Sequence, residues 1–371
     1  MEGSLMRPKK FSTKIFWALR ICGIGAACLG SQHIQAGEIR EFYKGARAQA
    51  MGNAFIGLAD DEEALFINPA GLAGITRPSL NYVVADLSVA SDFLATYKQG
   101  AEAFKKIDGD SLNVIMGKNL TAEAQITPTL VMPHIGVGVL VDGQVGLHAE
   151  NQALPRIKLG YQTTSGLQVG YGTAIGKKAS KRFGELRVGV AGKMVWRRGG
   201  IRKVPTLTLL TINKDVLGGI IGNYGAGYGL DLGTQYVIKP ANRFTFSTGF
   251  VYTDIGDTSF GEGPDPIKGN LGLGFAGQYD LGAIKVAATY DYKHMLDRTD
   301  FRKKNHFGLE VDLPLVSAYA GFNQVYFTYG GSVDVWLLRV TALSYAEEQG
   351  SFVFQNPERR WVLRLALKFN I

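Results

Sequence analysis

Cysteine is nearly absent from this sequence, and both copies, Cys22 and Cys28, lie close to its start. The long remainder of the chain therefore excludes disulfides and thiolate metal ligands. Histidine is also scarce, and no two of the five copies have the spacing of metal ligands. These histidines are His33, His134, His148, His294 and His306. We therefore expect no metal site and no cofactor.

Long hydrophobic runs are missing as well, although 46% of the residues are hydrophobic and 11% are aromatic. No apolar run is long enough for a transmembrane helix. The formal charge of +8 is inflated by the basic first 36 residues, which carry half of it. The modest surplus that remains is no argument for nucleic-acid binding, and we expect none.

The start of the chain reads as a secretory signal peptide over residues 1–36. Its basic beginning precedes a short apolar core from Ile21 to Leu29, and cleavage is expected after Ala36. A lipoprotein leader would use Cys28 instead, but Gly25 stands where that signal has a large aliphatic residue. The signal peptide is therefore the preferred interpretation.

Most of the remaining chain alternates apolar and polar residues with a period of two, which is typical of β-strands. The clearest case is the last segment, where Trp361, Leu363, Leu365, Leu367 and Phe369 oppose Arg364 and Lys368. The pattern predicts fourteen strands. We place them at 78–91, 122–132, 134–148, 157–176, 185–199, 222–238, 243–255, 269–280, 283–293, 304–312, 315–323, 329–336, 338–347 and 358–371.

The predicted connections alternate between tight turns and longer loops, as expected for a membrane barrel with inner turns and outer loops. The longer ones include 256–268 and 324–328. A soluble β-sandwich would also alternate, but aromatic residues gather towards the strand ends, as in interfacial girdles. We predict an all-β, 14-stranded antiparallel transmembrane β-barrel in the lipid of the bacterial outer membrane.

One stretch breaks this pattern, from Gly45 to Ile75, which is rich in small residues and lacks strand alternation. Asp60 with Glu63 has the form of a capping box that opens a short helix. Asn68-Pro69 then ends that helix, because the residue before a proline is pushed out of the α region.

This stretch also resembles the N-terminal signature of the FadL-like outer-membrane proteins, a group that includes PorV-type barrels. The resemblance is carried by the runs Ala50–Phe55, Asp60–Asp61 and Asn68–Leu72. It implies a plug folded inside a 14-stranded barrel. The expected domains are the signal peptide 1–36, a plug at 37–77 and the barrel at 78–371. The implied plug or gate residues are Gly52, Asp60, Asp61, Asn68, Pro69, Ala70 and Gly71, and Arg47 is a candidate partner for acidic lumen residues.

The resemblance implies passive uptake of small hydrophobic molecules, fatty-acid-like or aromatic, through a lumen gated by the plug. Two outer loops are candidate access routes for such a ligand. Loop 92–121 has apolar residues at helical spacing, and loop 200–221 has an apolar cluster. Alternatively, the loops pack on each other as a lid. The access residues are Phe93, Tyr97, Phe104, Leu207, Leu209 and Leu210.

Other functions remain as alternatives. A non-transporting scaffold similar to PorV-type barrels would use the same fold to hold a secretion or surface protein. An enzyme is not expected, since no serine, histidine and acid are spaced as a hydrolase would need. Gly225, Gly227 and Gly229 resemble a phosphate loop only superficially and read as strand glycines. Either barrel would need the outer-membrane assembly machinery as a partner.

Overall fold

The protein is described by a computed structural model that places residues 41–99, 114–150, 156–176, 183–205, 222–261 and 263–370. All of these residues belong to one compact unit, Ala36–Ile371. No helix within these ranges is long and apolar enough to cross a membrane. The expected signal peptide and the residues Phe104, Leu207, Leu209 and Leu210 lie outside the described ranges.

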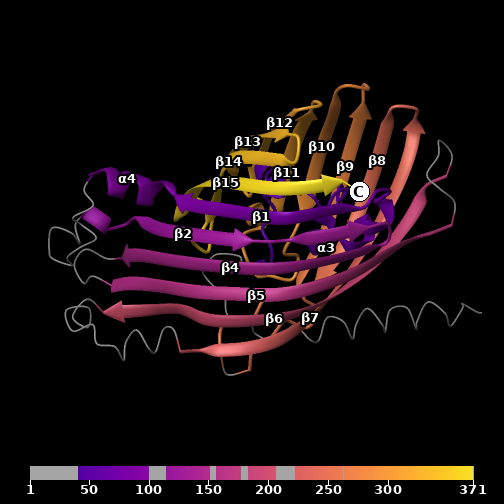
Figure 1. Ribbon diagram of the computed structural model, residues 1–371. Helices are drawn as coiled ribbons and strands as arrows, with labels where there is room; N and C mark the ends of the chain where they lie inside the picture. The colour runs from indigo at the N-terminus through magenta and orange to yellow at the C-terminus, as the bar shows by residue number, and fades with distance from the viewer. Residues whose placement is uncertain are drawn as a thin grey trace, which may run out of the picture. The chain divides into compact units, whose positions relative to one another are not determined.

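The described strands form one antiparallel sheet that closes on itself (Figure 1). β15 pairs with β1 from Ser79–Asn370 to Ala90–Arg360, which completes the barrel. The strands are β1 Ser79–Ala90, β2 Asn119–Ile126, β3 Thr129–Met132, β4 Ile135–Glu150, β5 Arg156–Ile175, β6 Glu185–Pro205, β7 Tyr224–Ala241, β8 Phe244–Thr253, β9 Asn270–Asp280, β10 Lys285–Tyr292, β11 Asn305–Asp312, β12 Val316–Asn323, β13 Tyr326–Val335, β14 Leu338–Glu348 and β15 Pro357–Asn370.

β2 and β3 occupy a single position in the wall, because both pair with β1 on one side and with β4 on the other. The closed barrel therefore has fourteen strand positions, and the prediction of a 14-stranded antiparallel barrel is confirmed. The predicted continuous strand 122–132 is interrupted at Thr127 and Pro128. Proline has no N–H group and cannot continue the ladder.

A second prediction about the wall is wrong. We expected a longer loop at 324–328, but only Gln324 and Val325 separate β12 from β13. Gln324 has a φ of 61°, which suits a tight turn. The residues that follow are already in β13, where Phe327 and Tyr329 are exposed on the outer face.

The two ends of the barrel differ. We call the end where β1 begins and β15 ends the terminal rim, and the opposite end the loop rim. Short turns join strands at the terminal rim, at 242–243, 281–284, 313–315 and 336–337. Longer connections lie at the loop rim, among them 254–269, 293–304 and 349–356, together with the tight turn at 324–325. In outer-membrane barrels the short turns face the periplasm and the longer loops face outward.

The helices are short. The 3₁₀-helix η1 covers Pro69–Gly74, and two α-helices precede it, α2 (Ala46–Ala50) and α3 (Ala64–Ile67). At the loop rim, α4 spans Ser91–Gln99 and η3 spans Phe301–Lys304.

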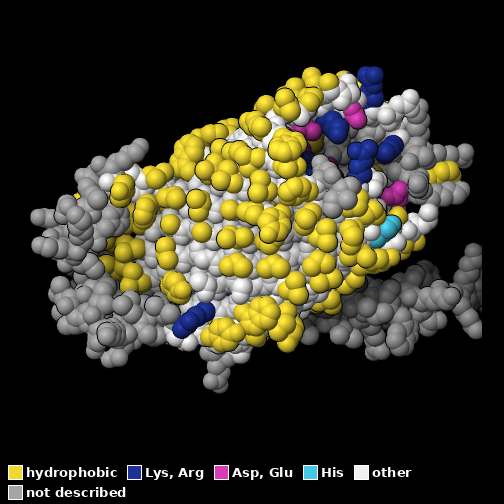
Figure 2. Space-filling model, viewed as in Figure 1, with side chains coloured by type: hydrophobic (Ala, Val, Ile, Leu, Met, Phe, Trp, Pro, Cys, Tyr) yellow, Lys and Arg dark blue, Asp and Glu magenta, His cyan; other side chains and the backbone are white. Residues whose placement is uncertain are grey.

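The outer face of the wall is apolar, whereas the inner face is mostly polar. Hydrophobic side chains spread over the outside of the barrel (Figure 2). On β15, Trp361, Leu363, Leu365, Leu367 and Phe369 are exposed, while Arg360 and Arg364 are buried. A soluble sandwich has the opposite arrangement, and an apolar outer wall suits contact with lipid. The protein is therefore an outer-membrane β-barrel.

Candidate functional site

The candidate site is built on residues 41–75, which we call the N-terminal segment. Short helices and reversals replace strand structure here, as the sequence predicts. α2 is followed by Gly52 and Asn53, whose φ angles of 66° and 63° reverse the chain. After α3 and η1 the chain straightens at Ile75 and enters β1.

The predicted boundaries of α3 are partly right. The helix ends at Ile67, and Asn68 has an extended backbone, so the stop at Asn68-Pro69 is confirmed. The predicted capping box is wrong, because Glu63 is itself the N-cap residue and its side chain makes no capping hydrogen bond. The side chain of Asp61 instead accepts a hydrogen bond of 2.9 Å from the Glu63 N–H.

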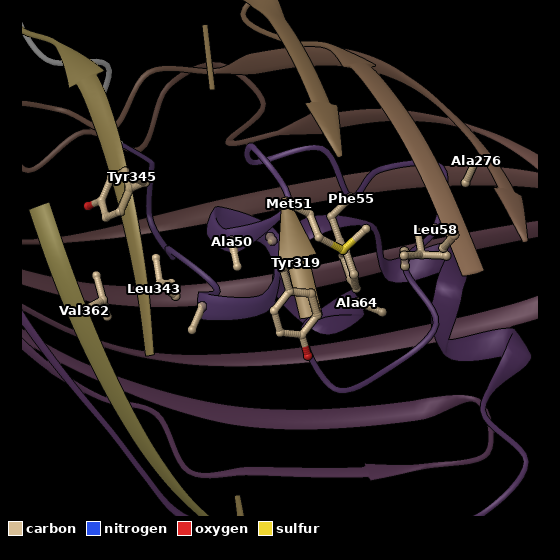
Figure 3. Packing of buried hydrophobic residues seen from close by; sticks show 14 residues of the cluster. Ala50, Met51, Phe55, Leu58, Ala64, Ala276, Tyr319, Leu343, Tyr345 and Val362 are labelled. Carbon is tan, nitrogen blue, oxygen red and sulfur yellow. The ribbon is translucent and has the colours of Figure 1, made fainter. Parts of the chain in front are cut away.

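The N-terminal segment packs an apolar surface against the inner face of the wall (Figure 3). The wall residues of this cluster come from strands on one side of the barrel, β9, β10, β12, β14 and β15. The labelled residues are Ala50, Met51, Phe55, Leu58 and Ala64 from the segment, and Ala276, Tyr319, Leu343, Tyr345 and Val362 from the wall. Their burial gives the segment a fixed seat on this side.

Glycines on the inner face allow the backbone of the segment to lie directly on the wall. A Cβ atom on Gly274 would lie 2.5 Å from the Gly57 nitrogen, and one on Gly172 would lie 2.6 Å from the Pro69 oxygen. Any larger side chain at these positions would displace the segment. The other glycines whose added Cβ would crowd the segment are Gly136, Gly138, Gly166, Gly170, Gly189, Gly233, Gly249, Gly272, Gly308 and Gly321.

Asn68 is fully buried and ties three parts of the structure together. Its side-chain amide donates to the carbonyls of Ile56 (3.0 Å) and Thr234 (3.2 Å), and its side-chain oxygen accepts from the Ala70 N–H (3.2 Å). The neighbouring Gly71 allows a close approach to the chain, because an added Cβ would meet the Ala59 carbonyl.

Asp291 on β10 caps a turn of the segment from the wall. One oxygen of its carboxylate accepts from the N–H groups of Phe55 (2.6 Å) and Ile56 (2.8 Å). Neutral wall side chains donate hydrogen bonds to backbone carbonyls of the segment. The Nε2 of Gln235 donates to Gly57 at 2.9 Å, and the hydroxyl of Ser247 donates to the same oxygen at 2.7 Å. The polar backbone of the segment is thus satisfied by the barrel interior.

Arg47 is the centre of an ionic cluster between the segment and β11. Its guanidinium contacts Asp60 and Asp61 within the segment, each at 2.7 Å. It also contacts Glu310 on the wall at 2.9 Å and 2.6 Å. Asp60 reaches the wall in turn, accepting from the Gln278 amide at 2.9 Å.

A second ionic cluster joins the segment to β15. Arg364 contacts Glu63 at 2.6 Å and Asp86 on β1 at 2.6 Å. Lys368 contacts Glu62 at 3.2 Å. A cavity of ≈ 30 Å³ lies between the two clusters, lined by Arg47 and Arg364 among others. This volume is sufficient for a water molecule.

Asp61 lies within this crowded region and holds its proton unusually strongly. Burial raises the pKa of Asp61 to about 7, and Glu62, Glu63 and Asp60 add to this effect, while Arg47 opposes it. The segment therefore carries a carboxyl group that changes charge near neutral pH.

At the loop rim the segment starts with another ionic contact. Glu41 lies 2.9 Å from Lys293 and 3.3 Å from His294, and His294 lies 3.6 Å from Asp297. Burial alone would raise the pKa of Glu41, but Lys293 and His294 hold it well below its ordinary value. Ion pairs thus hold the segment at Glu41, at Arg47 and at residues 60–63.

The predicted plug residues and Arg47 are brought together in this structure, whereas the predicted access residues are not. Phe93 and Tyr97 lie on α4 at the loop rim. Phe93 packs against a small cluster that contains Ile115 and Ala149, while 60% of the Tyr97 surface is exposed. Neither residue belongs to the clusters around the N-terminal segment.

Asp291, Arg364 and the glycines under the segment were not predicted as site residues. Each occupies an inward position in the strand alternation, and the pattern therefore gave their face. It could not give their partners, because these lie more than 200 residues away along the chain for Asp291 and Arg364.

No family model matches the sequence, and no curated protein matches it. Solved barrels do match the fold. A deltaS2S3 mutant of the TodX monoaromatic hydrocarbon channel aligns with a TM-score of 0.50 and 11% identity, covering 88% of this chain and 98% of that one. The Pseudomonas putida toluene transporter TodX aligns with a TM-score of 0.48 and 11% identity over 91% and 99% of the two chains. The Ralstonia pickettii toluene transporter TbuX gives 0.47 and 12% over 88% and 98%.

At such low identity, the similarity to the TodX mutant shows a shared fold and nothing finer. The predicted FadL-like barrel is thus confirmed at the level of the fold of the whole chain.

Proposed function

We propose that this outer-membrane barrel, which has the FadL-type fold, admits small hydrophobic molecules by passive diffusion, with the N-terminal segment as its gate. The shared fold supports the ligand class, because the matching structure is a monoaromatic hydrocarbon channel. The seating of the segment supports the gating.

One observation carries the proposal, which is the reach of the segment across the barrel interior. Its hydrogen bonds extend from Gln168 on β5 and Gln235 on β7 to Asp291 on β10 and Arg364 on β15. A segment held from so many strands obstructs the lumen. Because these contacts are hydrogen bonds, water molecules can replace them when the segment shifts.

The N-terminal segment also has an apolar surface, formed by aromatic side chains. Phe42 and Phe66 have ring centroids 6.3 Å apart, and Tyr43 stacks on Phe66 at 4.3 Å. These rings join wall residues such as Val131 and Val195 in one buried cluster. Once the segment loosens, an aromatic hydrocarbon could pack against these rings, because aromatic rings pack well against one another.

A reducible cross-link tests the gate. Asp60 on the segment and Gln278 on β9 are in direct contact at 2.9 Å, and both sit in partly exposed surroundings. In the double variant Asp60→Cys, Gln278→Cys, we would join the thiols with a short reducible bifunctional reagent and measure uptake of a monoaromatic probe into proteoliposomes. Uptake should fall after cross-linking and recover after reduction. Asp60→Cys alone, treated identically, is the matched control.

Uptake that is unaffected by the cross-link would contradict gating by the segment. Uptake equal to that of empty liposomes, with or without cross-link, would contradict transport. That second result would favour the scaffold similar to PorV-type barrels. Co-purification of a secretion or surface protein would then be the next measurement.

A further inference from the structure

The connection between β8 and β9 turns into the barrel instead of projecting from it. Residues 254–261 and 263–268, which we call the inner loop, start at the loop rim. Thr258, Phe260 and Ile267 are buried, with 0%, 4% and 1% of their surface exposed. Thr258 and Ile267 exchange two backbone hydrogen bonds of 2.9 Å and 3.0 Å, which join the two limbs of the loop.

Three alternating glycines on the inner face of β7 form the seat of this loop. A Cβ atom on Gly227 would lie 2.5 Å from the Ser259 carbonyl, and one on Gly229 would lie 2.6 Å from the Thr258 hydroxyl. A Cβ on Gly225 would meet the Phe260 carbonyl. The glycine run that superficially resembles a phosphate loop therefore makes room for a peptide backbone.

A buried ionic network fastens the start of the inner loop to β6 and β7. Lys193 contacts Asp231 and Asp254, each at 2.9 Å, and all three side chains are at most 4% exposed. The Asp254 N–H donates to Asp231 at 2.7 Å, and the Thr258 hydroxyl donates to Asp254 at 2.6 Å. Charges this deeply buried and this well paired resist separation.

Arg197 on β6 holds the far part of the inner loop. Its guanidinium donates to the Asp265 carbonyl at 3.0 Å and lies 5.1 Å from the centre of the Phe260 ring. The loop is therefore fixed at its start by Lys193 and near its return limb by Arg197.

The inner loop and the N-terminal segment share contacts. Phe260 and Ile267 belong to the same apolar cluster as Phe42 and Leu65 of the segment. The Lys193 ammonium that binds the loop also lies 4.9 Å from the Phe42 ring. Along β7, the loop covers the glycines nearer the loop rim, and the segment covers the inner face nearer the terminal rim.

We propose that the inner loop is a second constriction of the lumen, in series with the N-terminal segment, and that it sets the size of the molecules that pass. This rests on the proposed uptake function. Access from the loop rim is narrowed by the inner loop. The buried apolar cluster that Phe260 and Ile267 share with Phe42 couples the position of the inner loop to that of the gate.

The seat glycines provide the test. Gly227→Val should displace the inner loop, whereas Ala226→Val, at the adjacent exposed position on the lipid face, should not. In each background we would introduce Thr258→Cys and measure its labelling by a membrane-impermeant maleimide. Overpacking against the loop should make labelling roughly tenfold faster or more in the Gly227→Val variant only. Heat-modifiable gel migration would confirm assembly. If Gly227→Val fails to assemble, Phe260→Ala is the second variant that should loosen the inner loop.

Two further readouts follow from the same variants without the cysteine. Ion conductance in planar bilayers should rise in Gly227→Val and stay unchanged in Ala226→Val, and proteoliposomes should then admit larger aromatic probes. Faster labelling with unchanged conductance would overturn the constriction, and unchanged labelling would overturn the seating. Raised conductance with no uptake of any hydrophobic probe would refute the proposed function while supporting the constriction.

Discussion

Arg47 and Glu310 form a two-pronged ion pair between the N-terminal segment and the barrel wall. The Nε–Oε1 distance is 2.9 Å and the Nη2–Oε2 distance is 2.6 Å, although the residues are 263 positions apart in the chain. Only 17% and 6% of the two side chains are exposed. Bidentate geometry fixes orientation as well as distance, so this pair orients α2 relative to the barrel wall.

Arg47→Gln should loosen the segment and raise ion conductance, because three carboxylates would lose their counter-charge. Removal of one partner from a well-buried pair costs about 3–5 kcal/mol, and partial exposure here makes this an upper value. The matched control is Arg302→Gln, since Arg302 pairs with Asp300 at the loop rim and is 46% exposed. The control should change conductance little, and equal effects in both variants would exclude a specific role for Arg47.

The segment should be held less firmly as the pH rises to neutrality. The folded pKa of Asp61 is about 7, well above the ordinary value of about 3.9. A raised carboxyl pKa contributes stability that is complete below about pH 4 and is lost as the pH rises to about 7. Conductance should therefore be larger at pH 8 than at pH 5.5. Asp61→Asn cannot ionise and should reduce this difference. If the variant kept the full dependence, Asp61 would not be its source.

Asn68→Ala should destabilise the segment by about 1–3 kcal/mol, because buried polar groups lose their hydrogen-bond partners. The carbonyl of Ile56 and the N–H of Ala70 are the groups affected in the segment. Resistance of the segment to added protease in detergent would measure the change. Asn242→Ala, in the exposed turn at 242–243, is the control and should leave protease resistance unaltered.

Leu365→Arg should impair assembly of the barrel. Leu365 is 44% exposed on the outer face of β15, and an arginine facing lipid near the midplane costs about 2–4 kcal/mol. Leu365→Ala keeps the face apolar and should assemble nearly normally. Heat-modifiable gel migration compares the two variants. Identical migration would mean that this face of β15 does not contact lipid.

Trp336 should lie in the membrane interface at the terminal rim. It is 94% exposed in the turn between β13 and β14, and the exposed Leu313 and Leu315 lie in the turn between β11 and β12. Tryptophan favours that interface. In a variant with Trp196 and Trp361 replaced by phenylalanine, brominated lipid should quench Trp336 fluorescence more strongly than acrylamide does.

The turn at 242–243, which contains Arg243 and lies close to Lys239, supplies the control for this measurement. In the same background, with Trp336→Phe added, Ala241→Trp should show the opposite preference, with stronger quenching by acrylamide. A Trp336 signal that behaves like Ala241→Trp would place the turns of β11–β14 in water.

The sequence alone determined the barrel, because lipid on one side and a polar interior on the other impose a period of two that each strand carries locally. Thirteen of the predicted strands and the inward face of Arg364 followed from this rule. The helix stop at Asn68-Pro69 was equally local, since proline restricts its own neighbour. The capping box failed because Glu63 pairs with the distant Arg364, which no local pattern contains.

Only the tertiary structure decided which inward residues meet. Strand closure brings Glu310 to Arg47 and Asp291 to Phe55, and neither partner is marked in the strand that carries it. Gly274 makes room for the N-terminal segment and Gly227 makes room for the inner loop. Nothing in the sequence distinguishes these two glycines. These contacts depend on the register of the whole closed sheet, and a register is a property of paired strands that no single stretch of sequence holds.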